Sequence, residues 1–354
     1  MSDKVLLKGN EAIAEAAIQA GCRHFFGYPI TPQTEVAAYM SRRMPKIGGT
    51  YLQAESEIAA INMVMGASAA GKRAMTSSSS PGISLKSEGI SYMVGCDLPG
   101  LIVNVQRGGP GLGGIQPSQA DYFQATKGLA HGDFYIPVLA PSSVQEMVDF
   151  TFLAFDLADR YRTPVMLLAD GILGQMMEPV AFAAREESVL PPKDWALTGT
   201  GGTRHPHIVN SLYLQPEDLE RTNRERFERY AVIADKEARY EAFMLDDADI
   251  VVAAYGATAR IAKNAIVAAR EKGIKAGLLR PITLWPFPNK AFAEKAQTAR
   301  AFVVTEMSMG QLIYDVEMAI RCSRPVTLCA RTGGIVPRPE EVLDKIMQAA
   351  GGNA

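Results

Sequence analysis

The sequence has few cysteines and no excess of charge of either sign. Its four cysteines, Cys22, Cys96, Cys322 and Cys329, form no Cys-x-x-Cys unit. A zinc or iron–sulfur site built from this chain alone is therefore not expected. We expect free, buried or half-buried thiols in a reducing compartment. The 36 Lys and Arg residues nearly balance the 38 Asp and Glu residues, which argues against a nucleic-acid-binding protein.

Long apolar runs are also missing. No stretch approaches the roughly 20 apolar residues that a membrane-spanning helix needs, so no membrane span is expected. Residues 1–4 lead into a short strand-like stretch and not into the apolar core of a signal peptide. We therefore predict a cytoplasmic protein. The length of 354 residues is typical of two globular domains, each with its own core.

Helix-like and strand-like segments alternate along the first half of the chain. We predict helices over residues 10–20, 36–44, 57–70 and 144–158, and strands over residues 24–28, 101–105 and 164–168. The last two strands are aliphatic without polar alternation, which is typical of a parallel sheet covered on both faces. The helix over 57–70 is apolar or small on nearly every side, so we expect it to be buried all round. The pattern predicts a doubly wound α/β fold.

A second α/β pattern begins near residue 249. Before it, residues 191–207 have little periodicity, and residues 216–240 form a predicted helix that is dense in Glu and Arg. Strands are then expected over 250–254, 276–279 and 301–305, with helices over 259–272 and near Phe292. We therefore predict three parts, namely residues 1–188, a linker with the charged helix over 189–245, and a second α/β domain over 246–354.

Side chains with chemical potential follow predicted strands or begin predicted helices, which is where open parallel sheets bind ligands. The segment 28–32 reads Tyr-Pro-Ile-Thr-Pro, and Thr31 before Pro32 has the form of a helix N-cap. Thr31 could instead hydrogen-bond a substrate carboxylate, helped by the positive end of that helix. The residues alone leave both roles open.

Glu57 and Arg107 mark two further places of this kind. Glu57 begins the apolar helix, where a buried carboxylate is useful only if something binds it. An acidic residue there could equally complement the helix N-terminus. Arg107 follows the strand 101–105 and could clamp a carboxylate with two parallel hydrogen bonds, or it could be solvated beside the glycine-rich loop.

That loop, residues 109–114, contains the pattern Gly-x-Gly-x-x-Gly. We reject a dinucleotide site because Pro110 lies inside the pattern and Gln116-Pro117 obstructs the helix that should open there. No Gly-Lys-Ser/Thr follows, so a P-loop is excluded too. The histidines are not spaced as a metal pair, and no metal site is expected on this chain. They are His24, His131, His205 and His207, of which His131 could approach a ligand but is better explained as solvated or structural.

Taken together, these motifs resemble the α subunits of the thiamine-diphosphate-dependent 2-oxoacid:ferredoxin oxidoreductases. The segments 28–32, 53–57, 76–82 and 103–110 occur in that family's order, and the similarity covers nearly the whole chain. The longer pattern over residues 111–128 looks most like the branched-chain, 2-oxoisovalerate members, and the 2-oxoglutarate members are close relatives. The resemblance implies a pyrimidine-binding domain followed by a domain like the C-terminal domain of transketolase.

The resemblance also implies roles for individual residues. Glu57 matches the family's catalytic glutamate by its nine-residue spacing to Gly66, and Glu55 does not. Its carboxyl would hydrogen-bond the aminopyrimidine of thiamine diphosphate and favour the imino tautomer, whose nitrogen removes the thiazolium C2 proton. Thr31 and Arg107 would hold the carbonyl and the carboxylate of the 2-oxoacid. The further cofactor contacts that it implies are Tyr28, Pro29, Ile30 and Ser80.

Partners follow from the same resemblance. Residues 169–171 read Ala-Asp-Gly, and no Asn follows at the distance at which thiamine enzymes hold diphosphate and magnesium. A separate β subunit would supply the diphosphate site, with Mg²⁺ and a [4Fe–4S] cluster on partner subunits. A γ and possibly a δ ferredoxin-like subunit, ferredoxin and coenzyme A complete the expected set. The second domain would serve assembly and coenzyme A access, with Arg280 and Glu306 as candidates. The alternative function is a non-catalytic, transketolase-like assembly subunit.

Overall fold

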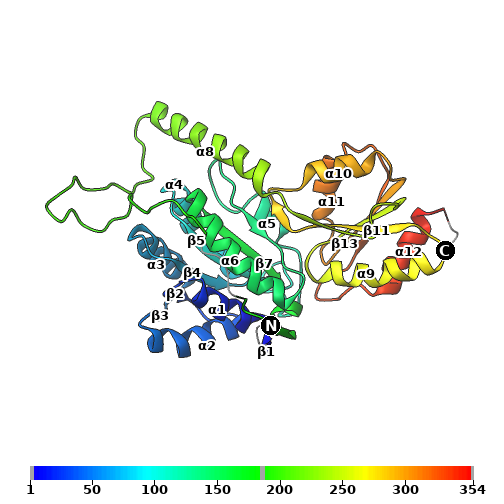
Figure 1. Cartoon of the computed structure of the whole chain (residues 1–354), viewed down its shortest axis with the longest axis horizontal. Coiled ribbons are helices and arrows are strands. Elements are labelled where there is room, and N and C mark those ends of the chain that lie inside the picture. Colours follow the sequence, from blue (N-terminus) through cyan, green and yellow to red (C-terminus); the bar gives the residue numbers. More distant parts are fainter. Residues whose placement is uncertain (1–3, 184–187, 352–354) are drawn as a thin grey trace.

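A computed structural model describes residues 4–183 and 188–351, which form two large sheets with helices on both faces of each (Figure 1). The first sheet contains β2 (His24–Gly27), β3 (Thr50–Gln53), β4 (Ala74–Ser78), β5 (Gly100–Gln106), β6 (Val138–Leu139), β7 (Pro164–Asp170) and β12 (Thr283–Trp285). Their order is β12-β6-β7-β5-β4-β2-β3, and β12 alone is antiparallel to its neighbour. The predicted α/β fold is confirmed.

Two helical layers enclose the first sheet. One consists of α1 (Gly9–Gln19), α2 (Thr34–Arg43) and α6 (Val144–Tyr161), and the other of α3 (Glu57–Ala69) and α4 (Ser80–Gly95). Each layer has its own apolar core, with Ile13 in the first and Ile61 in the second. Gly21 adopts φ +82° after α1, as its predicted role at the end of that helix requires. A short ribbon of β1 (Val5–Lys8) and β8 (Met177–Val180) lies outside this sheet.

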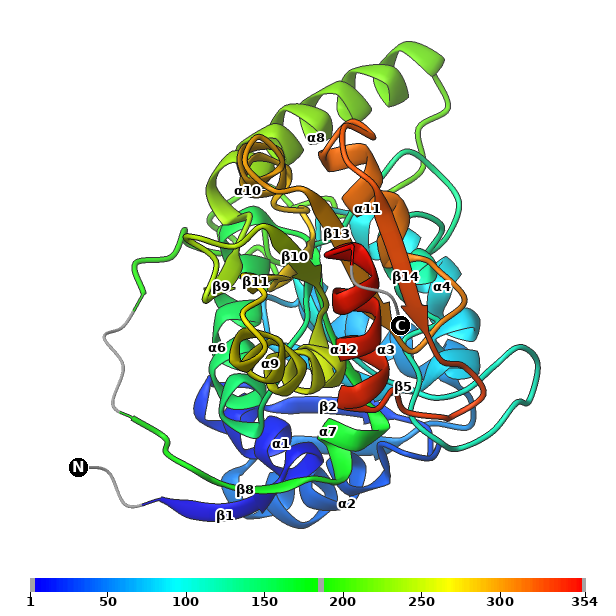
Figure 2. The ribbon, with the colours of Figure 1, turned by 90° about the vertical axis from the view of Figure 1, so that its right-hand side faces the viewer.

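The second sheet follows α8 (Pro216–Glu237) and contains β9 (Tyr240–Phe243), β10 (Ile250–Ala253), β11 (Ala276–Pro281), β13 (Ala301–Glu306) and β14 (Val326–Ala330). Its order is β14-β13-β10-β11-β9, with β9 antiparallel. The helices α9 (Gly256–Glu271) and α12 (Pro339–Ala349) cover one face, and α10 (Asn289–Ala296) and α11 (Leu312–Ala319) cover the other (Figure 2). The chain thus contains two doubly wound units in series.

Some local expectations are wrong. Thr31 does not cap a helix, because α2 begins at Thr34 with Gln33 before it, and the Pro32 carbonyl instead accepts side-chain hydrogen bonds. The charged helix α8 ends at Glu237 and not at residue 240, because the backbone turns extended at the next residue and β9 begins soon after. Cys322 is an exposed thiol, whereas we expected all four thiols to be at least half-buried.

The apolar helix α3 is not buried all round. Its inner face packs on β2, β4 and α4, but Ile58 is 49% exposed, and Asn62 and Gly66 on the same stripe are exposed too. No other element of the described residues covers this stripe. Among the same residues, no helix combines the length and apolarity that crossing a bilayer requires.

Asp170 joins the two units at the end of β7. Its Oδ1 accepts from the amides of Ile172 and Leu173 and so caps the short helix α7 (Gly171–Gln175), at 2.9 and 3.1 Å. Its Oδ2 accepts from the Ala257 amide in the first turn of α9, at 3.4 Å. Burial raises the pKa of Asp170 from its ordinary value of 3.8 to about 6.

This raised pKa predicts a pH dependence of stability. Protonated Asp170 is favoured in the folded chain, so its contribution is present below pH 4 and is lost as the pH rises through about 6. As the pH rises from below 4 to above 6, the free energy of unfolding of the native protein should fall by about 3 kcal/mol relative to that of Asp170→Asn. About 1 kcal/mol of this fall should occur between pH 5 and pH 7. Urea unfolding of both proteins at several pH values measures this difference. A difference that is constant with pH would contradict the prediction.

Candidate active site at the carboxyl edge of the first sheet

The sequence-predicted site residues meet at one edge of the first sheet. They follow β2, β3, β4 and β5, which are parallel and adjacent, so their carboxyl ends lie side by side. Arg107 Nη1 donates to the Thr31 carbonyl at 3.1 Å, and the Arg107 amide donates to the Ser80 hydroxyl at 3.0 Å. Three segments that are far apart in the sequence are thereby tied together.

Glu57 is the first residue of α3, and its side chain points into the protein. The preceding Ser56 caps the helix by accepting from the Ala59 amide at 3.1 Å, which fixes where the helix begins. Glu57 is only 6% exposed. Neither of its carboxylate oxygens forms a hydrogen bond or ion pair with another described residue. A buried, unpartnered carboxyl group of this kind is costly unless a ligand binds it.

Gly82 on α4 makes room for this carboxyl group. A methyl group at Gly82 would lie 2.8 Å from Glu57 Oε1 and 2.1 Å from Ser78 Oγ, so only glycine fits there. The hydroxyl groups of Ser78 and Ser79 are buried and have no hydrogen-bond partner. Unpartnered buried polar groups are rare in folded proteins, and the Ser78 hydroxyl group borders the same space at Gly82 as the Glu57 carboxyl group. Sequence reasoning singled out the segment 76–82 but none of these three positions.

Arg107 is buried and not solvated. Its side chain is bounded by two backbone carbonyl groups, those of Thr31 at 3.1 Å and Leu112 at 3.2 Å, and its Nε has no partner. The residue is 8% exposed, and no carboxylate among the described residues forms an ion pair with it. A buried guanidinium without a counter-ion is suited to bind an anion.

The other residues predicted to contact the substrate or cofactor differ in their exposure to solvent. Thr31 and Pro29 are exposed, Tyr28 is 37% exposed, and Ile30 is half-buried. The Ser80 hydroxyl is used within the protein. It donates to Asp121 Oδ2 at 2.6 Å.

Asp121 belongs to a buried network that sequence reasoning did not find. Its Oδ2 also accepts from Asn104 Nδ2 at 2.9 Å, so that it links β5 to the start of α4 through Ser80. Burial raises the pKa of Asp121, and hydrogen bonds from Ser80 and Asn104 oppose the shift. This network holds the Ser80 hydroxyl in place, and that hydroxyl accepts from the Arg107 amide.

The candidates in the second unit are tied up in structural contacts. Arg280 is fully buried between Glu146 and Glu241, at 2.7 and 3.1 Å. Glu306 is fully buried and accepts from backbone amides at the start of α11. His131 is exposed and packs edge-on against Tyr92. None of the described residues forms a cluster of three or more potential metal ligands.

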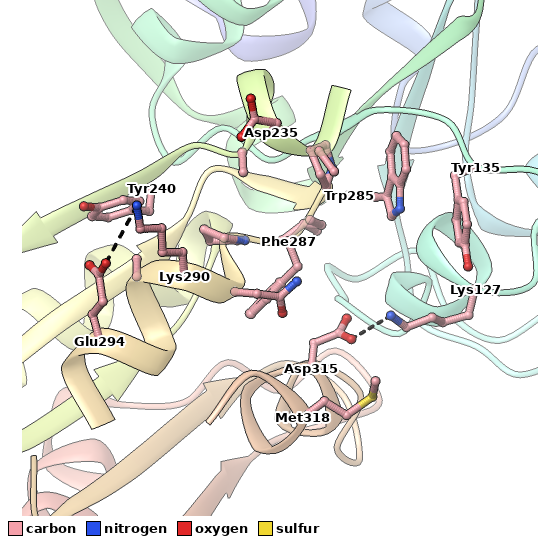
Figure 3. Close-up of a pocket in the computed structure, with 17 residues that line it drawn as sticks. Lys127, Tyr135, Asp235, Tyr240, Trp285, Phe287, Lys290, Glu294, Asp315 and Met318 are labelled. Atoms are coloured by element: carbon pink, nitrogen blue, oxygen red, sulfur yellow. Dashed lines mark hydrogen bonds and ion pairs between the residues drawn. The ribbon is translucent and has the colours of Figure 1, made fainter. Parts of the chain in front are cut away.

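A separate cavity of about 630 Å³ lies between the two units, beside α8, α10 and α11 (Figure 3). Tyr135 stacks on Trp285 at its wall, with ring centroids 5.1 Å apart, and Lys127 pairs with Asp315 at 2.6 Å. No sequence-predicted site residue lines it. The candidate active site is therefore the open sheet edge and not this cavity.

Comparison with known proteins identifies the family of this chain. Residues 15–241 match the family described as pyruvate flavodoxin/ferredoxin oxidoreductase, thiamine-diphosphate-binding, and residues 248–342 match core domain II of pyruvate:ferredoxin oxidoreductase. The chain belongs to the 2-oxoacid:ferredoxin oxidoreductase family. Its relatives in this family include the ketoisovalerate oxidoreductase subunit VorB of Methanothermobacter marburgensis, which is 50% identical over 98% of both chains. The 2-oxoglutarate synthase subunit KorA of the same organism is 38% identical over 98% of this chain and 99% of its own. The resemblance inferred from the motifs is confirmed.

Solved structures add the arrangement of the fold. The 2-oxoglutarate:ferredoxin oxidoreductase of Magnetococcus marinus, solved with 2-oxoglutarate, coenzyme A and succinyl-CoA bound, matches with a TM-score of 0.87 and 29% identity. The match covers 98% of the chain described here but only 65% of the solved chain, which is longer. A split-gene transketolase, described as an inactive beta4 tetramer, matches over 98% of both chains with a TM-score of 0.60 and 15% identity. It shows the fold alone, and the expected likeness to transketolase is confirmed at that level.

Proposed function

We propose that this chain is the α subunit of a 2-oxoacid:ferredoxin oxidoreductase. The complex would convert a 2-oxoacid and coenzyme A to acyl-CoA and CO₂ and pass electrons to ferredoxin. We propose 2-oxoisovalerate as the first substrate, because of the VorB identity, and 2-oxoglutarate as the second. One observation carries the proposal: an unpartnered buried carboxyl group, on Glu57, shares a sheet edge with a buried guanidinium without a counter-ion, on Arg107.

The residues present fit thiamine diphosphate. Glu57 offers a carboxyl group to a ring nitrogen, Gly82 leaves room beside it, and Ser78 and Ser79 have unused hydroxyl groups. When bound, this cofactor supplies the carbon nucleophile and holds the electron pair that is left when CO₂ departs. Glu57 would hold a proton between its carboxyl oxygen and the aminopyrimidine nitrogen.

The substrate would be bound by the groups that meet at Arg107. Its guanidinium would orient the carboxylate that leaves as CO₂, and Thr31 would hold the carbonyl oxygen, so that the bond breaks from a fixed geometry. Tyr28, Pro29, Ile30 and Ser80 remain proposed cofactor contacts. The Ser80 hydroxyl group forms hydrogen bonds with Asp121 and with the Arg107 amide, and these favour a role for Ser80 in positioning Arg107.

Partner subunits are part of the proposal. VorB and KorA are named as subunits, and the exposed stripe of α3 next to Glu57 has no cover within the described residues. A β subunit would supply the diphosphate site, and partner subunits would carry Mg²⁺ and the [4Fe–4S] clusters. A ferredoxin-like γ subunit with or without a δ subunit, cytoplasmic residence and the division into residues 1–188, 189–245 and 246–354 stay predictions.

The alternative is a non-catalytic assembly subunit with the same fold. The transketolase likeness would suit it, but that likeness concerns the fold alone. An assembly subunit has no need of a buried carboxyl group and a buried guanidinium that lack partners. The site therefore favours the catalytic reading.

Co-expression of this chain with its partner subunits tests the proposal. The purified complex is assayed for methyl viologen reduction with 2-oxoisovalerate, 2-oxoglutarate, pyruvate and an aryl pyruvate, each with and without coenzyme A and thiamine diphosphate. We expect reduction that requires both, and that is fastest with 2-oxoisovalerate. A complex that binds thiamine diphosphate but reduces the dye with none of the four acids would refute the function. A different preferred acid would refute only the substrate.

A further inference from the structure

A lysine is buried directly behind the proposed catalytic carboxyl group. Lys86 lies in the middle of α4 and is 0% exposed. Its Nζ donates to the backbone carbonyl of Glu57 at 3.3 Å. Lys86 stands one helical turn after Gly82 and on the same face of α4. That helix thus presents a space to the Glu57 carboxylate and an ammonium group to the Glu57 backbone.

Glu57 is the anion that acts on this ammonium group. The helix α3 carries no other titratable residue, and β5 carries none at all. On β7 the one acidic residue, Asp170, is held by backbone amides, and Asp121 is held by Ser80 and Asn104. Glu88, on α4 itself, is exposed and accepts from Tyr92.

Burying the charged side chain of Lys86 at this position lowers the stability of the fold. Burial lowers its pKa from 10.5 to about 8, and the charge of Glu57 opposes the shift. A methionine of similar length would fill the same space without a buried charge. Packing between α3 and α4 therefore does not explain a lysine at this position.

We propose that Lys86 is a positioning residue of the active site, whose ammonium group fixes the first turn of α3 and places a positive charge behind the Glu57 carboxyl group. This inference rests on the proposed function, because it acts through Glu57. A nearby cation favours the ionised carboxylate. Glu57 would share its proton with the aminopyrimidine nitrogen beside that charge. Loss of the Lys86 charge should weaken this sharing and slow the activation of the cofactor.

The test compares Lys86→Met and Lys86→Arg with the unmodified complex. The readout is the rate at which the C2 proton of bound thiamine diphosphate exchanges with deuterium, measured from pH 6.5 to 9.5 without substrate or coenzyme A. At pH 7 we expect exchange at least tenfold slower in Lys86→Met. The deficit should shrink toward none as the pH rises past about 8, where the native lysine also becomes neutral. Lys86→Arg should keep fast exchange across the range, because arginine stays charged.

A second readout, the melting temperature of the complex without cofactor, reports on the charge of Lys86 itself. Because burial lowers the pKa of Lys86, the native complex gains stability relative to Lys86→Met as the pH rises through about 8. Its melting temperature should therefore approach that of the variant between pH 7 and 9.5. Lys72→Met, an exposed lysine just beyond α3, is the matched control and should change neither readout.

Two outcomes would overturn the inference. One is an exchange rate in Lys86→Met that equals the native rate at pH 7. The other is an equal loss in both Lys86 variants at every pH, which would indicate packing alone. Glu57→Gln separates this failure from that of the proposed function. If Glu57→Gln abolishes exchange while Lys86→Met does not slow it, only the inference about Lys86 falls. If Glu57→Gln also exchanges normally, the proposed function falls with it.

Discussion

Glu57→Gln is expected to reduce the 2-oxoacid-dependent viologen reduction of the assembled complex by about 100- to 10,000-fold, the usual range for loss of an acid–base group. Glutamine has nearly the same shape as glutamate, so packing against Gly82 and Ser78 is kept. It cannot share a titratable proton with the aminopyrimidine nitrogen, so the loss should fall on kcat. Steady-state assays at saturating thiamine diphosphate measure it.

Glu55 offers the matched control for this experiment. It lies two residues earlier, is exposed, and carries the same functional group. Glu55→Gln should leave kcat within about twofold of the native value, as surface substitutions usually do. Equal activity of Glu57→Gln and the native complex would instead support the assembly-subunit alternative.

Arg107→Met is expected to lower kcat/KM for the 2-oxoacid by roughly 30-fold or more, because truncating one partner of a buried charge pair costs about 2–5 kcal/mol. The loss should appear mainly in KM, since the guanidinium binds the carboxylate before it reacts. Arg107→Lys should recover part of it. A lysine keeps the charge but cannot make two parallel hydrogen bonds to a carboxylate.

A substrate analogue provides the control for Arg107. The amide of the same 2-oxoacid lacks the negative charge, so it should inhibit the native complex and Arg107→Met with similar constants. If the variant lost affinity for both compounds equally, Arg107 would be supporting the loop through the Thr31 and Leu112 carbonyls. Its role in carboxylate binding would then be refuted.

Much of the fold could be predicted from local pattern. Aliphatic runs marked β5 and β7, and Gly21 marked the end of α1, because these signals act within a few residues. The prediction that α3 is buried on all sides was wrong. Composition shows that a helix is apolar, but it does not show which of its sides the same chain covers. The prediction that Thr31 caps a helix was also wrong. The Pro32 carbonyl accepts a hydrogen bond from Asn10, which is distant in sequence and so could not be foreseen from the local pattern.

The candidate site was predictable to the level of strand ends. Glu57 and Arg107 could be singled out because parallel strands place their carboxyl ends together. Lys86 and Asp121 could not, because nothing in their sequence neighbourhoods shows that they are buried. Their positions depend on how closely α4 packs on α3 and β5, which is a property of the assembled layers. The unpartnered hydroxyl groups of Ser78 and Ser79 become visible only in three dimensions.

The antiparallel strand β12 has a consequence for how the chain can be made. It comes from the second half of the sequence, yet Thr283 and Trp285 pair with β6 and cover the outer margin of the first sheet. During synthesis the outer edge of β6 stays unpaired until the segment around Trp285 has left the ribosome. A bare strand margin readily recruits other strands. An N-terminal half made without residues 283–285 would therefore leave the outer edge of β6 open to pairing with other strands.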